Sequence, residues 1–292
     1  MAAERGLERH ELRARVRELR QRLQLSQEEL AEVLGWHRSK VYRIEAGRTP
    51  ISPDDLASLL ARLPDVPDDE GADLLTLARS AKRATPAPLH QGLSPSARRY
   101  VDYESAAREI WNYEPMFVPG LLQVPAYTEA LLTGLSAKQP APAAVRRAVE
   151  VRGRRQQILT RRAPVDLHVL LDESAIVRRV GDRTVMVRQL EHLWAMSERP
   201  NVSLAVVPFD HGVHPMLRAP FVVMRLAEHP RAGMLFIENT VNEVITVAGE
   251  DSTTDPADYL DAFERVSRSA LTGDAVAERL KRALRQTAVE TT

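Results

Sequence analysis

The sequence contains no cysteine, and this absence excludes several kinds of chemistry. Disulfide bonds, thiol nucleophiles and zinc sites with cysteine ligands all require cysteine sulfur. No stretch approaches the roughly 18 uninterrupted apolar residues of a membrane-spanning helix. The amino terminus, MAAERGLERHELRARVREL, is charged throughout and lacks the apolar stretch of a secretion signal. We therefore expect a cytoplasmic protein without a membrane segment.

The chain also lacks an excess of charge of either sign. Lys plus Arg and Asp plus Glu both number 40 among 292 residues, so there is no general attraction to polyanions. Residues 1–50 nevertheless contain 11 lysines and arginines against 8 acids. Contact with nucleic acid would therefore depend on a local basic face. The length favours two domains, each large enough to bury a core.

Residues 26–48, SQEELAEVLGWHRSKVYRIEAGR, have the pattern of two short helices joined by a tight turn. Ser26 and Glu29 form a capping-box pair that starts the first helix. Gly35 stands where the helix needs a left-handed terminal residue, which glycine adopts without a Cβ penalty. The residues that recur on one face of this helix are Leu30, Ala31 and Leu34.

The second helix begins at His37 and places Val41 and Ile44 on its inward face, and Gly47 is expected to close it. In a helix–turn–helix the second helix enters the major groove of DNA, where its amino-terminal residues contact base edges. The residues expected to face outward are Arg38, Ser39, Lys40, Tyr42 and Arg43.

These outward residues suit DNA recognition. Arg bridges O6 and N7 of guanine, a contact worth roughly 1–3 kcal/mol of discrimination, so Arg38 and Arg43 are the main candidates for base contacts. Ser39 and Tyr42 are candidates for further base contacts. Contacts to phosphates, which set the register, are expected from Gln27, Lys40 and Arg48.

Two other interpretations of this segment are open. Two short amphipathic helices with solvated arginines also form an ordinary corner of a helical bundle. A helix–turn–helix that has lost its affinity for DNA would instead serve protein interactions. The grouping of Arg38, Lys40 and Arg43 favours DNA binding, because a helix–turn–helix that no longer binds DNA does not require these cations on one helix.

Helices are expected on both sides of this motif. One runs from Glu8 to Gln24, one begins at Ser52 and Pro53, and one spans Asp68 to Lys82. The expected buried stripe of the first of these helices is Leu12, Val16, Leu19 and Leu23. The five helices predict an all-α domain at residues 1–83. The proline-containing sequence ATPAPLHQGLSPSA, residues 84–97, is expected to be a semi-rigid linker.

The segment LQLSQEELAEVLGWHRSKVYRIEAGR resembles the Cro and phage-repressor helix–turn–helix proteins, also called the Xre family, over about residues 8 to 83. The resemblance implies a five-helix, lambda-repressor-like domain and an ion pair between Arg20 and Glu45, expensive to break from one side. His37 departs from the family, which usually has Ser or Thr as N-cap. The matching positions are Leu25, Gln27, Leu30, Ala31, Gly35, Val41, Ile44, Glu45 and Gly47.

Residues 98–292 mix helical and strand periodicity and predict an α/β domain. The segments VDLHVLLDE, NVSLAVVPF, FVVMRLAE and GMLFIEN are rich in branched residues and predict strands, and NEVITVAGE suggests another. A helix at 183–197 lies between the first two strands and predicts a βαβ crossover. We expect a helix from Val101 to Ile110. Two helices after Pro256 suit internal packing or a dimer seam.

This second domain is similar to the domain of unknown function that follows Xre-type readers in many actinobacterial regulators, over about residues 98 to 275. Those proteins are often described as antitoxin-like, with relatives linked to development and antibiotic production. The resemblance implies regulation by a small-molecule effector or by a small partner protein encoded nearby. The segments that carry it are YEPMFVPGLLQVPAY, LDESAIVRR, RPNVSLAVVPFDHGVHP and FIEN.

The effector or partner site is expected around the aromatic and proline-rich passage from Tyr113 to Tyr127. The alternative is a buried extended segment that seals the core. The candidate site residues are Tyr113, Glu114, Phe117, Gln123, Tyr127 and His214.

Asp210, His211 and His214 lie close together in sequence and suit a divalent metal. However, the chain has no HExxH, GxSxG, Walker or GxGxxG motif, and His214 before Pro215 is equally suited to holding a turn. We therefore expect no catalytic residues, metal or cofactor, and a metal-dependent enzyme is the less favoured alternative.

The sequence thus predicts an all-α DNA-binding domain followed by a mixed α/β domain, 98–292, for effector or partner binding and dimerisation. The expected function is a transcriptional regulator that binds double-stranded DNA as a homodimer on an inverted repeat and is nucleoid-associated when bound. The alternative is an antitoxin-like interaction protein with weak DNA binding.

Overall fold

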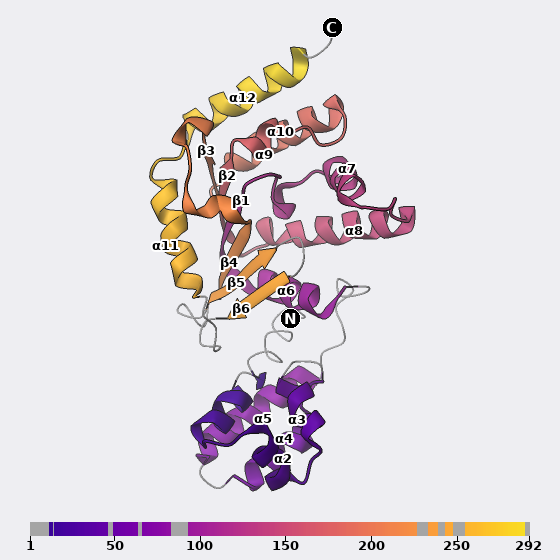
Figure 1. Ribbon diagram of the computed structural model, residues 1–292, viewed down its shortest axis with the longest axis vertical. Coiled ribbons are helices and arrows are strands. Elements are labelled where there is room, and N and C mark those ends of the chain that lie inside the picture. The colour runs from indigo at the N-terminus through magenta and orange to yellow at the C-terminus, as the bar shows by residue number, and fades with distance from the viewer. Residues whose placement is uncertain are drawn as a thin grey trace. The chain divides into compact units, whose positions relative to one another are not determined.

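The computed structural model describes residues 12–13, 15–45, 49–63, 66–82, 93–226, 233–238, 243–247 and 255–289. Two compact units are present, unit 1 (Met1–Ala106) and unit 2 (Ala107–Thr292). Figure 1 shows the helices of unit 1 and the sheet of unit 2. No described helix is both long and apolar enough to cross a membrane.

The amino-terminal part of unit 1 is a set of helices, as predicted. Residues 15–22 are helical and precede the four helices α2 (Gln27–Leu34), α3 (Arg38–Glu45), α4 (Pro53–Ala61) and α5 (Asp68–Lys82). Ser52 caps α4, with its hydroxyl accepting the Asp55 N–H at 3.0 Å. Gly47, which is expected to close α3, lies outside the described residues.

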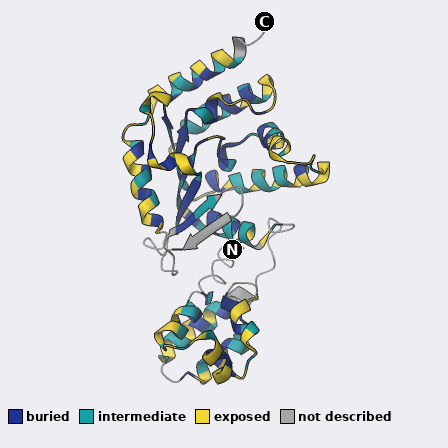
Figure 2. Cartoon of the chain, viewed as in Figure 1, coloured by how far each residue is buried: buried dark blue, intermediate teal, exposed yellow. Residues whose placement is uncertain are grey.

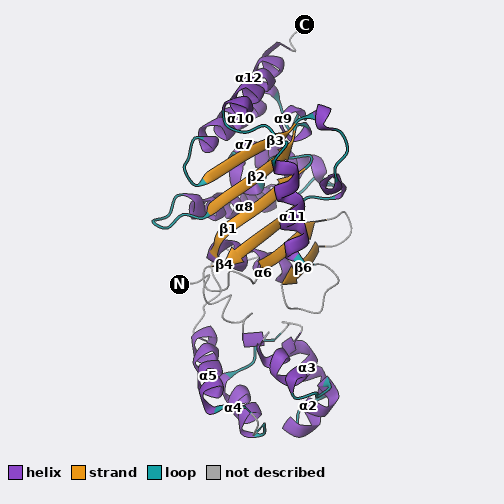
Figure 3. Ribbon diagram, turned by 90° about the vertical axis from the view of Figure 1, so that its left-hand side faces the viewer, coloured by secondary structure: helices purple, strands orange, loops and turns teal. Residues whose placement is uncertain are grey.

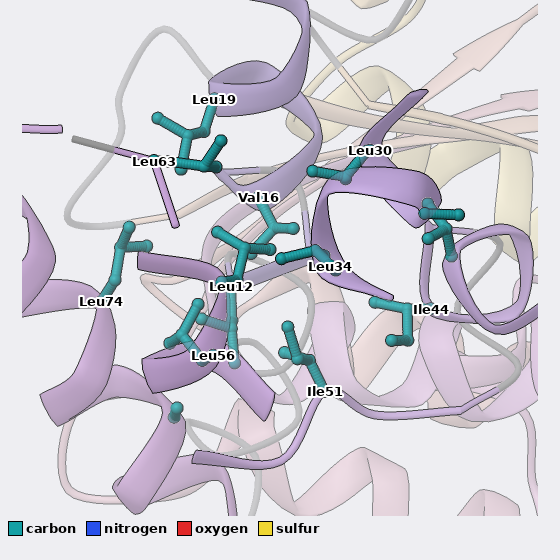
Figure 4. Packing of buried hydrophobic residues seen from close by; sticks show 14 residues of the cluster. Leu12, Val16, Leu19, Leu30, Leu34, Ile44, Ile51, Leu56, Leu63 and Leu74 are labelled. Carbon is teal, nitrogen blue, oxygen red and sulfur yellow. The ribbon is translucent and has the colours of Figure 1, made fainter. Parts of the chain in front are cut away.

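The core of these helices is built mainly from leucines at helical spacing (Figure 4). Leu12, Val16 and Leu19 from the first helix are at most 3% exposed, as their spacing predicted, whereas Leu23 of the same stripe is half-buried. Full burial of such a side chain contributes roughly 1.5–3 kcal/mol. Figure 2 shows buried and exposed residues alternating along these helices. Residues buried from the later helices include Leu30, Leu34, Val41, Ile44, Leu56, Leu59 and Leu74.

The segment after α5 differs from its prediction. Residues 83–92, most of the expected linker, lie outside the described residues. Residues 95–97 were assigned to the linker, but they form the first turn of α6 (Pro95–Ala106).

The predicted helix from Val101 to Ile110 is wrong in its second half. The chain leaves α6 at Ala106 and continues as strand β1 (Ala107–Glu114). β1 includes Arg108, Glu109 and Asn112 and lacks the apolar run of the other strands, and the alanines before it favour a helix. Pairing on both sides of β1 outweighs these local preferences.

Unit 2 contains a six-stranded sheet in the order β3-β2-β1-β4-β5-β6. The five strands predicted from the sequence are present as β2 (Asp166–Asp172), β3 (Val202–Val207), β4 (Phe221–Leu226), β5 (Gly233–Glu238) and β6 (Glu243–Val247). β1, β2 and β3 are parallel, and the pairs from β1 to β4 through β6 are antiparallel. The predicted helix between β2 and β3 is α10 (Arg183–Ser197), which makes the crossover.

Helices lie on both faces of this sheet (Figures 1 and 3). One side carries α7 (Pro125–Leu135), α8 (Pro142–Arg155) and α10, while α11 (Pro256–Ser267) covers the other. The helix α12 (Asp274–Val289) packs against α10. Short elements complete the unit: α9 (Ser174–Val177), η2 (Gly120–Leu122), η3 (Gln156–Leu159), η4 (Phe209–His211) and η5 (Pro215–Arg218).

The two terminal helices bury their apolar residues inside unit 2. Leu260, Phe263 and Val266 of α11 join Leu170 and Tyr113 in one cluster. Val276 and Leu280 of α12 are at most 1% exposed. Internal packing therefore accounts for these five apolar positions, and a dimer seam along the two helices stays a prediction.

Candidate DNA-binding interface and sheet-edge cluster

The helix–turn–helix starts with the predicted capping box. The Glu29 N–H donates to Ser26 Oγ at 3.1 Å, and the Ser26 N–H donates to Glu29 Oε2 at 2.7 Å. Gly35 ends α2 with φ 65° and ψ 28°, the left-handed conformation expected for it. The angle between α2 and α3 is thus set by local hydrogen bonds and by a glycine that tolerates positive φ.

His37 supplies the cap of α3 in place of the usual Ser or Thr. Its Nδ1 accepts the Ser39 backbone N–H at 3.2 Å and lies 2.8 Å from Ser39 Oγ. The imidazole therefore satisfies an N–H of the first turn, as a Ser or Thr oxygen normally does. The Ser39 hydroxyl is engaged by the same nitrogen, so a contact from it to a base would compete with this bond.

Three of the five residues predicted on the outward face of α3 are exposed, and Ser39 and Lys40 are half-buried. Val41 and Ile44 are buried, whereas Arg38, Tyr42 and Arg43 are exposed, Tyr42 to 47%. Arg38 Nη1 lies 3.1 Å from Glu28 Oε1 in an ion pair of two exposed side chains. Arg43 makes no ion pair with any residue that the structure describes. Arg48 lies outside the described residues.

A buried ion pair fixes the position of α3. Arg20 Nε donates to Glu45 Oε1 at 2.7 Å and Arg20 Nη2 to Oε2 at 3.0 Å, the pair that the family resemblance implied. Arg20 Nη1 also donates to the Leu25 carbonyl at 2.6 Å. Gln27, expected at a phosphate, instead donates its side-chain amide to Glu45 Oε2 at 2.7 Å. This network links the first helix, α2 and α3.

Lys40 is also engaged within unit 1. Its ammonium lies 2.6 Å from Asp55 Oδ1 on α4 and 4.0 Å from the centre of the Trp36 ring. Contact with a phosphate would require Lys40 to leave Asp55. The sequence contained no sign of this pair, because Asp55 follows Lys40 by fifteen residues on a different helix.

The predicted effector-site residues of unit 2 fall into two groups. Gln123 and Tyr127 hold the turn that follows β1. Gln123 Nε2 donates to the Val118 carbonyl at 2.6 Å, and the Val118 N–H donates to the Tyr127 hydroxyl oxygen at 3.2 Å. Arg152 Nη1 donates to Gln123 Oε1 at 2.7 Å. Both residues therefore have a structural role in the interior. Glu114 and Phe117 are half-buried.

Tyr113 and His214 form the second group, at the end of β1 and in the β3–β4 loop. Their rings meet edge to face with centroids 5.8 Å apart, and the His211 ring lies 5.4 Å from that of His214. Among the described residues, no hydrogen-bond partner is found for Tyr113 OH, His211 Nδ1 or either ring nitrogen of His214. We call Tyr113, His211 and His214 the sheet-edge cluster.

Burial changes the acid–base properties of this cluster. Burial, followed by the negative charges of Asp172 and Glu114, raises the pKa of Tyr113, so its hydroxyl remains protonated. Burial, followed by the neighbouring His211, lowers the pKa of His214 and outweighs the opposite effect of Asp172. The imidazole of His214 is therefore neutral at pH 7, with one donor and one acceptor nitrogen.

The two buried tyrosines provide a matched pair of stability tests. Tyr113→Phe removes a hydroxyl without a partner among the described residues, so we expect the free energy of unfolding of unit 2 to stay within about 0.5 kcal/mol or rise. Tyr127→Phe leaves the buried Val118 N–H unpaired and should lower the free energy of unfolding of unit 2 by about 1–2 kcal/mol. Urea unfolding of both variants measures the difference. Equal losses would contradict this assignment.

The stability of unit 2 should fall as the solution becomes mildly acidic. Burial lowers the pKa of His168, His192 and His214 below 6.5 in the folded chain. The unfolded chain binds more protons in this range, so stability is complete above pH 6.5 and is lost as the pH decreases through the lowered pKa values. Urea midpoints between about pH 7.5 and 5.5 test this. A His192→Gln variant should show a smaller slope, and stability rising on acidification would refute the expectation.

The loop from Asp210 to His214 does not gather three metal ligands, as the less favoured metal-site alternative would require. Asp210 is exposed, and His211 Nε2 contacts Ser269 Oγ at 2.8 Å. The described residues contain no group of three or more His, Asp or Glu arranged to hold a metal ion. The contact with Ser269 joins segments far apart in sequence, and no sequence pattern could have predicted it.

Another feature without a sequence signal is a surface pocket of about 790 Å³ beside β3. Trp111 of β1 stacks on His168 of β2 at this pocket, with ring centroids 5.1 Å apart. Trp194 of α10 and Arg268 also line it. Its residues come from separate strands and helices, so only the fold brings them together.

Two parts of the chain match known protein families. Residues 11–74 match a family described as a helix-turn-helix domain. Residues 97–282 match a family described as a domain of unknown function, DUF5753, which spans the sheet and most of α12. No curated protein and no solved structure matches the chain. Unit 1 therefore contains a helix-turn-helix domain, a class typical of DNA-binding regulators.

Proposed function

The chain belongs to the DUF5753 domain family and carries an amino-terminal helix-turn-helix domain, and from this premise we propose that it is a sequence-specific, DNA-binding transcriptional regulator. The face of α3 carries this proposal, because Arg38, Tyr42 and Arg43 are exposed on a short helix that a buried network holds in place. A rigid helix with exposed arginines is what bidentate base recognition requires.

Arg43 and Arg38 are assigned the base contacts. Arg43 is exposed without an ion-pair partner among the described residues, so guanine recognition there breaks no existing pair. The pair of Arg38 with Glu28 is exposed on both sides, and such pairs contribute only about 0–1 kcal/mol. Arg38 can therefore exchange Glu28 for a base at little cost. Ser39 and Tyr42 supply additional contacts.

The three residues proposed for phosphate contacts, Gln27, Lys40 and Arg48, differ in how they would contribute. Lys40 would contact a phosphate by releasing Asp55. The side chain of Asp55 is 31% exposed, so water can solvate it after release. Gln27 supports DNA binding indirectly by holding Glu45, because its side-chain amide already donates to that carboxylate. Arg48 follows α3 in sequence and remains a proposed phosphate ligand. The expected salt dependence of binding comes from these contacts.

The proposed assembly is a homodimer on an inverted repeat. One recognition helix reads only a few base pairs, and two-fold proteins match half-sites about one helical turn apart. The proposal extends to an Xre-type, actinobacterial and antitoxin-like regulator that acts on its own promoter in the cytoplasm. Unit 2 would bind an effector or a small partner protein and shift the dimer between two states. Light scattering that shows a monomer at micromolar concentration would contradict the dimer.

Titration of a duplex from the gene's own upstream region tests the proposal. Wild-type protein should bind this duplex more tightly than a scrambled one, and an Arg38→Ala, Arg43→Ala variant should lose about 1–3 kcal/mol of discrimination per arginine. The matched control is Arg22→Ala, Arg79→Ala, which removes the same charge from other helices of unit 1. This control should keep its preference for the operator sequence at every salt concentration.

Equal, weak and strongly salt-dependent binding by wild type and variant would mean phosphate attraction alone. That outcome would favour the antitoxin-like interaction protein with weak DNA binding. A metal-dependent enzyme would instead be supported by stoichiometric metal in the purified protein that is lost in a His211→Ala, His214→Ala variant.

A further inference from the structure

The carboxyl ends of the three parallel strands meet at one edge of the sheet. Glu114 at the end of β1 pairs with Leu171, and Asp172 at the end of β2 pairs with Val207 of β3. In open α/β sheets, ligands bind outside the carboxyl ends of the strands. Tyr113 lies at this edge, and the loop that follows β3 brings His211 and His214 to it.

The sheet-edge cluster contains an unusual concentration of unpaired polar atoms. Tyr113 is 0% exposed and His214 is 6% exposed. Four polar atoms on the three neighbouring rings have no hydrogen-bond partner among the described residues. Each buried group left unpaired costs about 1–3 kcal/mol, so an arrangement of four adjacent ones calls for a partner that is not part of the protein.

The bond between His211 and Ser269 defines what this partner must offer. The Ser269 hydroxyl donates to the Val266 carbonyl at 3.0 Å, so its oxygen accepts from His211 Nε2–H at 2.8 Å. In the neutral ring, His211 Nδ1 is then an acceptor. It meets no donor among the described residues. A hydroxyl or an amine group of a ligand can supply that donor.

The charges around the cluster disfavour an anion. Asp172 is 8% exposed, and its Oδ1 accepts only the Ser174 backbone N–H at 2.9 Å among the bonds of the described residues. The nearby cation Arg279 is already paired with Glu173 at 2.5 Å. Negative potential from Asp172 therefore remains, and it favours a neutral or positively charged group.

Exposed apolar residues follow the same strand ends in the chain. Five of the six large apolar residues that are exposed in the described part of unit 2 follow the ends of β1, β2 and β3. Val213, next to His214, is 94% exposed. Ligand sites combine an apolar lining with a few placed polar groups. The five residues are Met116, Val177, Phe209, Val213 and Leu217.

We propose that Tyr113, His211 and His214 bind the hydroxyl or amine group of a neutral or cationic small molecule whose apolar body contacts Met116, Phe209 and Val213. This site deepens the proposed function, because it names the chemical class of effector that unit 2 would bind. Only the regulatory role of that effector rests on the proposed function. Binding itself is independent of DNA recognition, so the two are tested separately.

The test uses the full chain with isotope-labelled histidines and three chemical probes. All three probes share a phenol ring with its hydroxyl and differ in the charge of the side chain: tyrosol adds a neutral alcohol, tyramine an ammonium and 4-hydroxyphenylacetate a carboxylate. We expect tyrosol or tyramine to shift the ring resonances of His211 and His214, with His168 and His192 as internal controls. The acetate should bind roughly tenfold more weakly or not at all.

Tyr113→Phe supplies the decisive variant, because it is expected to fold normally. It should weaken binding of the effective probe by about three- to tenfold, as expected for one lost hydrogen bond. Tyr100→Phe in α6 of unit 1 should leave probe binding unchanged. The proposal is overturned if neither tyrosol nor tyramine shifts His211 and His214, if the acetate binds equally well, or if Tyr113→Phe binds like wild type.

The operator titration separates this site from the regulatory function. Probe binding at the cluster without any change in DNA affinity supports the site and contradicts the effector role of unit 2. Loss of specific DNA binding in otherwise normal protein contradicts the proposed regulator and leaves the result of the probe experiment intact.

Discussion

Glu45→Ala is expected to lower the free energy of unfolding of unit 1 by about 3 kcal/mol, because it leaves the largely buried guanidinium of Arg20 without its carboxylate. The side chains of Arg20 and Glu45 are only 11% and 4% exposed. The substitution also removes the acceptor of the Gln27 amide. Urea unfolding with hydrogen exchange and mass spectrometry would assign the loss to peptides of unit 1.

The exposed pair of Arg22 and Glu70 provides the control for Glu45→Ala. Its side chains are 50% and 25% exposed, so Glu70→Ala should cost at most about 1 kcal/mol. A double variant, Arg20→Met with Glu45→Leu, should regain much of the lost stability because it buries no unpaired charge. Similar losses for Glu45→Ala and Glu70→Ala would show that the buried network does not hold α3.

Gly181→Ala is expected to lower the free energy of unfolding of unit 2 by about 2–5 kcal/mol, from left-handed backbone strain and overpacking together. Gly181 has φ +70°, and an added Cβ would lie 2.9 Å from Cβ of Ala130 and 3.2 Å from Cβ of Val185. The residue thus allows the start of α10 to approach α7 closely.

Gly273→Ala isolates the backbone part of this effect. Gly273 has φ +52°, and nothing lies within 4 Å of an added Cβ. Its substitution should therefore cost only about 1–2 kcal/mol. Thermal and urea unfolding of the two variants measure the difference. If both lose the same stability, the contact with Ala130 and Val185 contributes nothing.

The regular elements could be predicted where local sequence signals agree with the fold. The capping box at Ser26, the glycine at position 35 and the leucine stripe of the first helix each appear in the structure as expected. The strands β2 to β5 carry branched apolar runs, and α10 lies between two of them. Each of these signals acts within a few residues, so neighbouring sequence is sufficient to read it.

The central strand β1 could not be predicted in the same way. Its sequence AREIWNYE follows alanine-containing helix α6 and includes charged and amide side chains. It becomes a strand because β2 and β4 pair with it from opposite sides. These partners lie far along the chain, and this long-range pairing overrides the local preference.

The roles of individual site residues also depend on contacts between helices that the local sequence does not specify. The outward direction of Arg38 and Arg43 follows from helical periodicity, and the structure shows both exposed. Gln27 and Lys40 have the same polar character, yet Glu45 and Asp55 draw them into bonds within unit 1. Periodicity identifies which face a residue occupies, while its partner depends on which helices pack together.

The sequence by itself determined that this protein has a helical, arginine-bearing amino-terminal segment followed by a domain of mixed strands and helices. Helix caps, glycine positions and apolar periodicity specify these features because they act over one or two turns. Only the tertiary structure placed β1 at the centre of the sheet, bonded Gln123 and Tyr127 to Val118, and joined Tyr113 to His211 and His214. Such contacts depend on strand order and register, which bring together residues that no local pattern connects.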